Sequence, residues 1–295
     1  TLVYGILFMI NFAHGEVMML GAFSCFFVFE AFKAIQVSTN PPQSFSNAYP
    51  VLAVLIAFVI GMTVSALMGY LLERIAYRPL RKAPRLVPLI SAIGASIFLQ
   101  NAAQLLFSPQ LRDVPNPEVL TRGSGWALMI NGSKVIIPYT GVFTFVLSLT
   151  LLATLYLVVQ KTKLGRAMRA VALDKTTAAL MGIDVDKTIS LTFIISGALA
   201  GAAGVMWGIH NGLVYYYVGF IPGIKAFTAA VLGGIGNLPG AMLGGLFMGV
   251  IESVGPAALG LDFQLKDVIA FALLIIVLIF RPSGLLGEKL AEEKL

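Results

Sequence analysis

Long apolar segments separated by short polar connections extend along almost the whole chain. A helix that crosses a bilayer needs about 20 apolar residues. On that criterion we predict spanning helices at about 15–34, 51–72, 87–107, 141–160, 189–209 and 266–281. Two further apolar pieces, 1–12 and 222–251, do not fit one regular span each. The pattern predicts an all-α fold, a polytopic transmembrane helical bundle in which residues 1–295 form a single domain.

The composition supports a membrane location for most of the chain. Of 295 residues, 58% are hydrophobic and 12% are charged, whereas soluble domains carry about 25% charged residues. The 30 glycines are consistent with close contact between transmembrane helices. Cys25 is the single cysteine, so it forms no intramolecular disulfide. The chain begins with Thr1 inside an apolar pattern, and we expect an N-terminal segment to be absent from this sequence.

The basic residues predict which connections face the cytoplasm. Segments 73–85, 161–187 and the tail from Arg281 together hold 14 of the 20 Lys and Arg residues. Segments 35–50, 210–221 and 252–265 hold none. Because cytoplasmic loops carry an excess of Lys and Arg, the first set is predicted to be cytoplasmic and the second set external. The basic residues are divided among loops without interleaved aromatics, so nucleic acid is not an expected partner.

Residues 222–251 are predicted to enter the membrane and return. The connections before and after them are both predicted to be external, which a single crossing cannot satisfy. Glycines and Pro239 interrupt the apolar run, and each half of about 15 residues would span about 22 Å. A re-entrant pair of half-helices broken at Asn237, Pro239 and Gly240 fits these facts. Two short tilted spans remain the alternative.

The stretch "INFAHGE" near the start of the chain is a second predicted break. Asn11, His14, Gly15 and Glu16 interrupt the apolar pattern just before the first span. Two interrupted apolar segments in matching positions of two halves indicate a transport pathway. We therefore expect two discontinuous segments and a pseudo-repeat, with a first half at about 1–107 and a second at about 141–281. The alternatives are direct contact of this stretch with substrate and a proton relay.

Glycines at helical spacing predict a packing face in span 189–209. Gly197, Gly201, Gly204 and Gly208 include two small-xxx-small pairs, which allow helix backbones to approach closely. Few charges lie within or beside the apolar segments; the candidates are Glu16, Glu30, Lys225 and Glu252. Ion-driven carriers place such residues at mid-membrane depth, so their scarcity argues for another energy source.

The cytoplasmic segment 161–189 is predicted to form a short surface helix. Its middle part, 165–181, is rich in Ala, Leu and Met, and Gly182 is the expected stop signal. On these residues alone, docking of a soluble partner and contact with the lipid surface are equally good interpretations.

Five motifs along the sequence resemble those of a known family. The motifs are "INFAHGE", "LERIAYRPLR", "LISAIGASIFLQN", "GRAMRAVALDKTTAALMGI" and "KAFTAAVLGGIGNLPGAMLGG". In this order they are similar to permease subunits of bacterial high-affinity branched-chain amino acid ABC transporters, the LivH type. The resemblance extends from Val3 to about Gly287. Members of that family usually have a further span before the position of Thr1.

The resemblance implies an importer with several subunits in the bacterial inner membrane. It implies a homologous LivM-like permease, two cytoplasmic ATPase subunits and a periplasmic amino-acid-binding protein that delivers Leu, Ile or Val. This chain would be a non-catalytic subunit without a cofactor, because its partners would bind ATP and Mg. Segment 161–189 would couple ATP hydrolysis to transport, through Arg166, Arg169, Asp174, Lys175, Ala178 and Gly182.

The residues themselves fit this scheme. The sequence contains no G-x-x-x-x-G-K-[ST] phosphate-binding motif, so energy would arrive through contact with another subunit. The helix ends near Asn11 and Asn237 would face the charged groups of the substrate. Phe227 and Met242 are candidate wall or gate residues, although packing is the simpler role for each.

Three other functions are alternatives to a branched-chain amino acid permease. An intramembrane enzyme needs a cluster of reactive groups, but His14 and His210 lie in separate segments and Cys25 is alone. A passive channel fits half-helices in the membrane but not the predicted coupling segment. Within the ABC class, the alternative is a permease for urea, short amides or other neutral amino acids.

Overall fold

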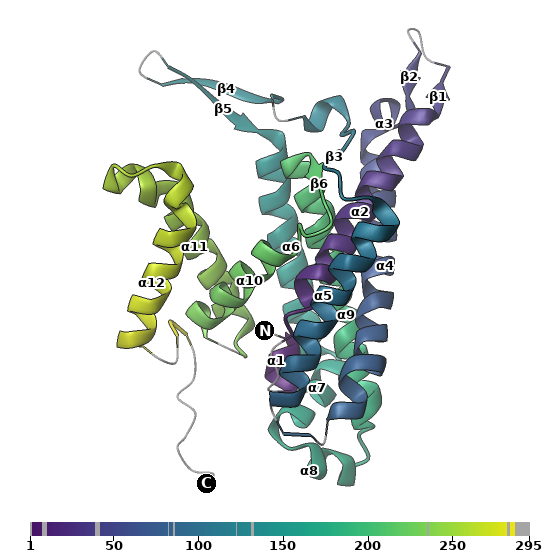
Figure 1. Cartoon of the computed structure of the whole chain (residues 1–295), viewed down its shortest axis with the longest axis vertical. Coiled ribbons are helices and arrows are strands. Elements are labelled where there is room, and N and C mark those ends of the chain that lie inside the picture. The colour runs from purple at the N-terminus through teal and green to yellow at the C-terminus, as the bar shows by residue number, and fades with distance from the viewer. Residues whose placement is uncertain are drawn as a thin grey trace.

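The computed structural model shows a helical bundle (Figure 1). It describes residues 2–7, 11–38, 42–81, 83–84, 86–121, 123–130, 133–234, 236–281 and 284–286. Within these residues, seven helices are long and apolar enough to cross a membrane. They are α2 (His14–Ala34), α4 (Pro50–Leu72), α5 (Leu86–Phe107), α6 (Tyr139–Lys161), α9 (Val185–Asn211), α11 (Leu238–Leu259) and α12 (Lys266–Phe280, extended by the 3₁₀ turn Phe263–Leu265).

Short elements complete the described fold. The short helices are α1 (Leu2–Leu7), α3 (Phe45–Ala48), α7 (Lys163–Leu173), α8 (Lys175–Leu180) and α10 (Phe220–Gly233), and a π-helical turn (Glu73–Tyr77) and a 3₁₀ turn (Arg78–Leu80) follow α4. Three antiparallel strand pairs are present: β1 (Gln36–Val37) with β2 (Gln43–Ser44), β3 (Arg112–Asp113) with β6 (Leu213–Val214), and β4 (Gly125–Ile130) with β5 (Ser133–Pro138). In Figure 1, α7 and α8 lie at one end of the bundle and the β1–β2 and β4–β5 hairpins at the other.

The prediction of an all-α membrane bundle is confirmed. Each of the six predicted spans corresponds to an observed helix whose ends differ by at most four residues. Four basic residues of the segments predicted to be cytoplasmic lie outside the described residues: Lys82, Arg85, Lys289 and Lys294. The division into two related halves stays a prediction.

Helices α2, α4 and α9 pack together at the centre of the bundle, where glycines bring their backbones into contact. A Cβ atom added to Gly204 of α9 would lie 2.1 Å from the carbonyl oxygen of Met18 in α2. A Cβ on Gly201 would lie 2.4 Å from the Gly61 oxygen of α4, and one on Gly197 would lie 2.6 Å from the Ser65 oxygen.

Gly208 differs from the three glycines before it on α9. The nearest neighbour of a Cβ added there is the Sγ atom of Cys25, at 3.5 Å, which is an ordinary van der Waals distance. The face predicted from the glycine spacing therefore lies at close backbone contacts at 197, 201 and 204 and has more room at 208.

The C-terminal helices α10, α11 and α12 pack on one another and form a separate unit beside the central helices (Figure 1). Helices α10 and α11 approach closely, because a Cβ on Gly244 would lie 2.2 Å from the carbonyl oxygen of Ala229. The prediction of two half-helices within 222–251 is wrong for its second part. Helix α11 has 22 residues and is long enough to cross a membrane, whereas α10 has only 14.

The physical reason lies in how the break and the glycines of α11 are stabilised. Gly234 ends α10 with a φ of 106°, and the Asn237 side chain accepts a hydrogen bond from the Gly240 N–H at 3.1 Å, so it caps α11. Pro239 stands in the first turn of α11, where its missing N–H costs nothing. The glycines beyond it continue the helix, because Gly244 lies against the backbone of α10.

The prediction of one continuous surface helix over 165–181 is also wrong. The segment forms α7 and α8, separated at Asp174. The Asp174 backbone is extended, with a φ of −156°, and its carboxylate accepts a hydrogen bond from the Thr176 N–H at 2.8 Å. An Asp at this position starts a new helix because its side chain satisfies an N–H group in the first turn of that helix, which has no partner within the helix itself.

Candidate functional site

A cavity of about 440 Å³ lies between α1, α2, α6, α9, α10 and α11. Most of its wall is apolar, including Leu152, Leu199, Phe227 and Met242. Polar groups come from Asn11 and His14, at the start of α2, and from Ser196 of α9. The cavity thus combines an apolar wall with a few polar groups, as sites for small molecules usually do.

The break between α1 and α2 lies directly at this cavity. The His14 N–H donates to the Asn11 carbonyl oxygen at 3.3 Å as α2 begins. Gly15 lies against α10, and a Cβ added there would stand 2.3 Å from the Gly219 oxygen. The ring of Phe12, just before α2, packs at a tilt against the ring of Phe227 in α10, with centroids 6.1 Å apart.

The structure therefore brings Asn11, His14, Gly15 and Phe227 together around one cavity. The candidates of the second break have other surroundings. Asn237, Pro239 and Gly240 begin α11 and are not among the residues that line the cavity. The second break nevertheless lies close to α1, because a Cβ on Gly5 of α1 would lie 3.5 Å from the Gly236 Cα.

Glu16 points away from the cavity and toward α5. It is fully buried, and its Oε1 atom accepts hydrogen bonds from Gln100 Nε2 at 2.8 Å and from Ser96 Oγ at 3.2 Å. Its Oε2 atom has no hydrogen-bond partner among the described residues. Glu16 therefore joins two spanning helices, a role that the sequence pattern did not suggest.

At the α7–α8 end of the bundle, large apolar side chains project away from the protein. Leu173, Leu180 and Met181 are 88%, 82% and 79% exposed. Gly182, with a φ of 83°, ends α8 in a left-handed conformation that glycine adopts easily. Sequence reasoning missed these three side chains, although their positions at helix ends beside Asp174 and Gly182 were a usable signal.

The six predicted coupling residues have unequal surroundings. Arg166, Asp174, Lys175 and Gly182 are exposed, whereas Ala178 is buried beneath α8. Arg169 donates to the carbonyl oxygen of Val159 at the end of α6, so it attaches α7 to the bundle. The exposed Lys175 loses part of its hydration against the protein, and this loss first and the nearby positive charge of Arg81 second lower its pKa.

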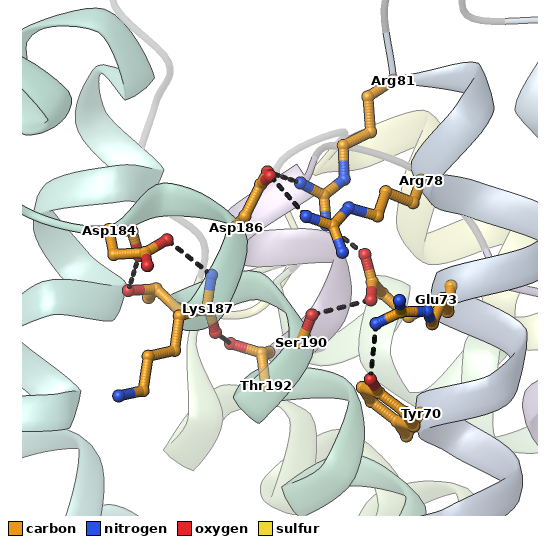
Figure 2. Close-up of polar contacts among 11 residues, drawn as sticks. Tyr70, Glu73, Arg78, Arg81, Asp184, Asp186, Lys187, Ser190 and Thr192 are labelled. Carbon is orange, nitrogen blue, oxygen red and sulfur yellow. Dashed lines mark hydrogen bonds and ion pairs between the residues drawn. The ribbon is translucent and has the colours of Figure 1, made fainter.

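Sequence reasoning also missed a network of charged residues at the same end of the bundle, shown in Figure 2. It joins Glu73, Arg78 and Arg81, which follow α4, to Asp186 and Ser190 of α9. A second group of charges joins the C-terminal helices. Lys225 of α10 lies 3.0 Å from a carboxylate oxygen of Glu252 in α11 and 2.6 Å from one of Asp267 in α12.

An apolar bundle with a broken helix beside a cavity has the organisation of a multi-pass membrane transport protein. The sequence profile of the family described as branched-chain amino acid transport system / permease component matches residues 1–278. The chain therefore belongs to that family.

Two individual relatives match the chain over almost their whole length, and a third matches over a shorter part. The chain is 45% identical over 295 residues to the high-affinity branched-chain amino acid transport system permease protein BraD of Pseudomonas aeruginosa, which covers 99% of this chain and 91% of that protein. It is 43% identical over 295 residues to the corresponding permease LivH of Escherichia coli K12, covering 99% and 90%. The fructose import permease FrcC of Rhizobium meliloti is 27% identical over 237 residues, covering 75% and 61%. No solved structure matches the chain.

Proposed function

We propose that the chain is the membrane permease of an ABC importer and forms the translocation pathway for leucine, isoleucine and valine. The observation that carries this proposal is the apolar cavity of about 440 Å³ beside the α1–α2 break. An aliphatic side chain fits its wall, and the polar groups at Asn11, His14 and Ser196 fit the ammonium and carboxylate of an amino acid. The names of BraD and LivH support the same substrate class.

The wall of the cavity would be completed by other subunits. We expect this chain to lie in the bacterial inner membrane beside a homologous LivM-like permease. A periplasmic binding protein would deliver the amino acid. Two cytoplasmic ATPase subunits would bind ATP and Mg, which leaves this chain without a catalytic role. The exposed apolar side chains Leu173, Leu180 and Met181 support docking of a soluble partner at the α7–α8 end.

Reconstitution tests the substrate class directly. The chain is assembled with its partner permease, ATPases and binding protein in ATP-loaded proteoliposomes, and uptake of radiolabelled L-leucine, urea and acetamide is compared. Leucine uptake that requires ATP is expected. Uptake of urea or acetamide in its place would show the alternative substrate class, and uptake without ATP would show a passive channel.

A cavity-filling variant tests the place of the pathway. Ala226 lines the cavity and is exposed to it, so Ala226→Trp fills space without a clash in the core. We expect it to reduce leucine uptake strongly. Ala258→Trp is the matched control, since Ala258 is an exposed residue of the same C-terminal unit and does not line the cavity. Equal uptake by the two variants would place the pathway elsewhere.

A further inference from the structure

The π-helical turn Glu73–Tyr77 stands between the cytoplasmic end of the bundle and the cavity. It directly continues α4 before the 3₁₀ turn Arg78–Leu80. Single π-helical turns are rare and occur frequently at functional sites. Glu73 is the first residue of this turn and Tyr77 is the last, and their side chains contact different neighbours.

Glu73 fixes one end of the turn to α9. It is a fully buried carboxylate in which both oxygens are used: Oε1 pairs with Arg81, and Oε2 accepts a hydrogen bond from Ser190 Oγ at 2.7 Å. Arg81 also pairs with Asp186, and Asp186 pairs with Arg78 at 2.8 Å (Figure 2). Two acids alternate with two bases, and the buried carboxylate of Glu73 therefore has a cationic partner, as burial of a charge requires.

This network lies close to the segment proposed to contact the ATPases. Asp186 stands in the first turn of α9, which follows α8 through residues 181–184. The charge of Arg81 also acts on Lys175 of α8. The chain therefore links α8 to Asp186, and ion pairs link Asp186 through Arg81 to Glu73.

Tyr77 connects the other end of the turn to the cavity. Its ring is buried against Phe193 of α9, with centroids 5.2 Å apart. Its hydroxyl donates to the Oδ1 atom of Asn11 at 2.8 Å. Asn11 lines the cavity and Tyr77 does not. Because the amide oxygen already accepts a hydrogen bond from Tyr77, the N–H₂ group is the donor that the Asn11 amide offers to a ligand.

We propose that Tyr77 is a positioning residue that orients Asn11 to donate a hydrogen bond to the carboxylate of the transported amino acid, and that the π-helical turn links this contact to the cytoplasmic charge network. The inference rests on the proposed function. The start of α2 favours the same polarity, because a helix N-terminus attracts negative charge. The structure thus assigns recognition of a carboxylate to the α1–α2 break and its control to the end of α4.

The test measures leucine transported per ATP hydrolysed by the complete complex in proteoliposomes. This ratio is unaffected by a smaller amount of folded complex, which lowers both rates equally. Tyr77→Phe removes only the hydroxyl, and we expect the ratio to fall about fivefold, as for the loss of one net hydrogen bond. Tyr70→Phe is the matched control on the same helix, since its hydroxyl accepts from Arg74 at 2.8 Å on an exposed face.

A double-mutant cycle separates positioning from a general loss of packing. Asn11→Ala is expected to lower the ratio, and adding Tyr77→Phe to it should have no further effect, because the two residues act through one contact. An unchanged ratio in Tyr77→Phe, or additive losses in the double variant, overturns the positioning role. Absence of leucine uptake by the unsubstituted complex overturns the proposed function instead, and this inference with it.

Discussion

Gly204 is the most sensitive point of the contact between α9 and α2. The substitution Gly204→Ala adds one methyl group, which would lie 2.1 Å from the Met18 carbonyl oxygen and 2.7 Å from the Ala22 nitrogen. Both neighbours are backbone atoms of a spanning helix, so no side chain can rotate to make room. The two helices must separate, and the close packing on either side of the contact is lost with them.

The size of the effect follows from two opposing contributions. Overpacking a core costs about 1–3 kcal/mol, and the rigid backbone neighbours place Gly204→Ala near the upper value. Replacing glycine by alanine within a helix returns about 0.5–1 kcal/mol. We therefore expect a net loss of about 2 kcal/mol.

Two glycines provide matched controls for the same substitution. In the part of the chain that the structure describes, no neighbouring atom lies within 4 Å of a Cβ added to Gly94 of α5 or Gly249 of α11. Gly94→Ala and Gly249→Ala should be neutral or slightly stabilising, since only the gain in helix propensity remains. Gly208→Ala should behave like these controls, because its nearest neighbour lies at 3.5 Å.

Thermal unfolding of the purified variants in detergent checks this reasoning. A change of 1 kcal/mol shifts Tm by about 2–4 °C for a domain somewhat smaller than this chain. Gly204→Ala should therefore melt about 4–8 °C below the unsubstituted protein. If Gly204→Ala melts together with Gly94→Ala and Gly249→Ala, the backbone contact between α2 and α9 does not limit stability.

Three further predictions concern the other contacts. Leu180→Glu should reduce co-purification of the ATPase subunits, because it places a charge on an exposed apolar side chain of α8. Leu111→Glu is the control and should have no such effect, since Leu111 is 65% exposed and lies outside that segment. Equal losses in the two variants would contradict docking at α8. Glu16→Gln should preserve Tm, because its amide oxygen can accept the same two hydrogen bonds, while Glu16→Ala should lower it; equal melting would show that these bonds contribute little. Lys225→Met should lower Tm by leaving two carboxylates without their cation, and adding Glu252→Gln should restore part of the loss; no recovery would argue against charge repulsion.

The spanning helices were predictable because each depends mainly on its own apolar length. Helix α9, for example, is specified by an apolar run, a capping Asp184 before it and Gly212 after it. The glycine spacing also predicted close contacts on α9. It did not distinguish Gly204 from Gly208, because the difference lies in which residues of α2 stand opposite.

Features that depend on distant segments were not predictable in the same way. The apolar composition of 165–181 favours one helix, and only the backbone conformation of Asp174 divides it. Gly240 was predicted to be part of a break but lies within α11, against the backbone of Gly233 in α10. The bond from Tyr77 to Asn11 joins residues 66 positions apart, and the ion pair of Arg81 with Asp186 joins residues 105 positions apart. No local pattern encodes such pairs.

The end of α10 has a consequence for the order in which the protein is made. The carbonyl oxygens of Leu232 and Gly233 accept hydrogen bonds from the N–H groups of Leu285 and Leu286, at 2.8 and 3.1 Å. Chain synthesis proceeds at about 5–20 residues per second, so these donors leave the ribosome some seconds after α10. Lipid cannot replace them. Hydrogen bonding at the end of α10 is therefore completed only after residues 285 and 286 have been synthesised, and truncation before Gly284 would leave the Leu232 and Gly233 carbonyl oxygens without these donors.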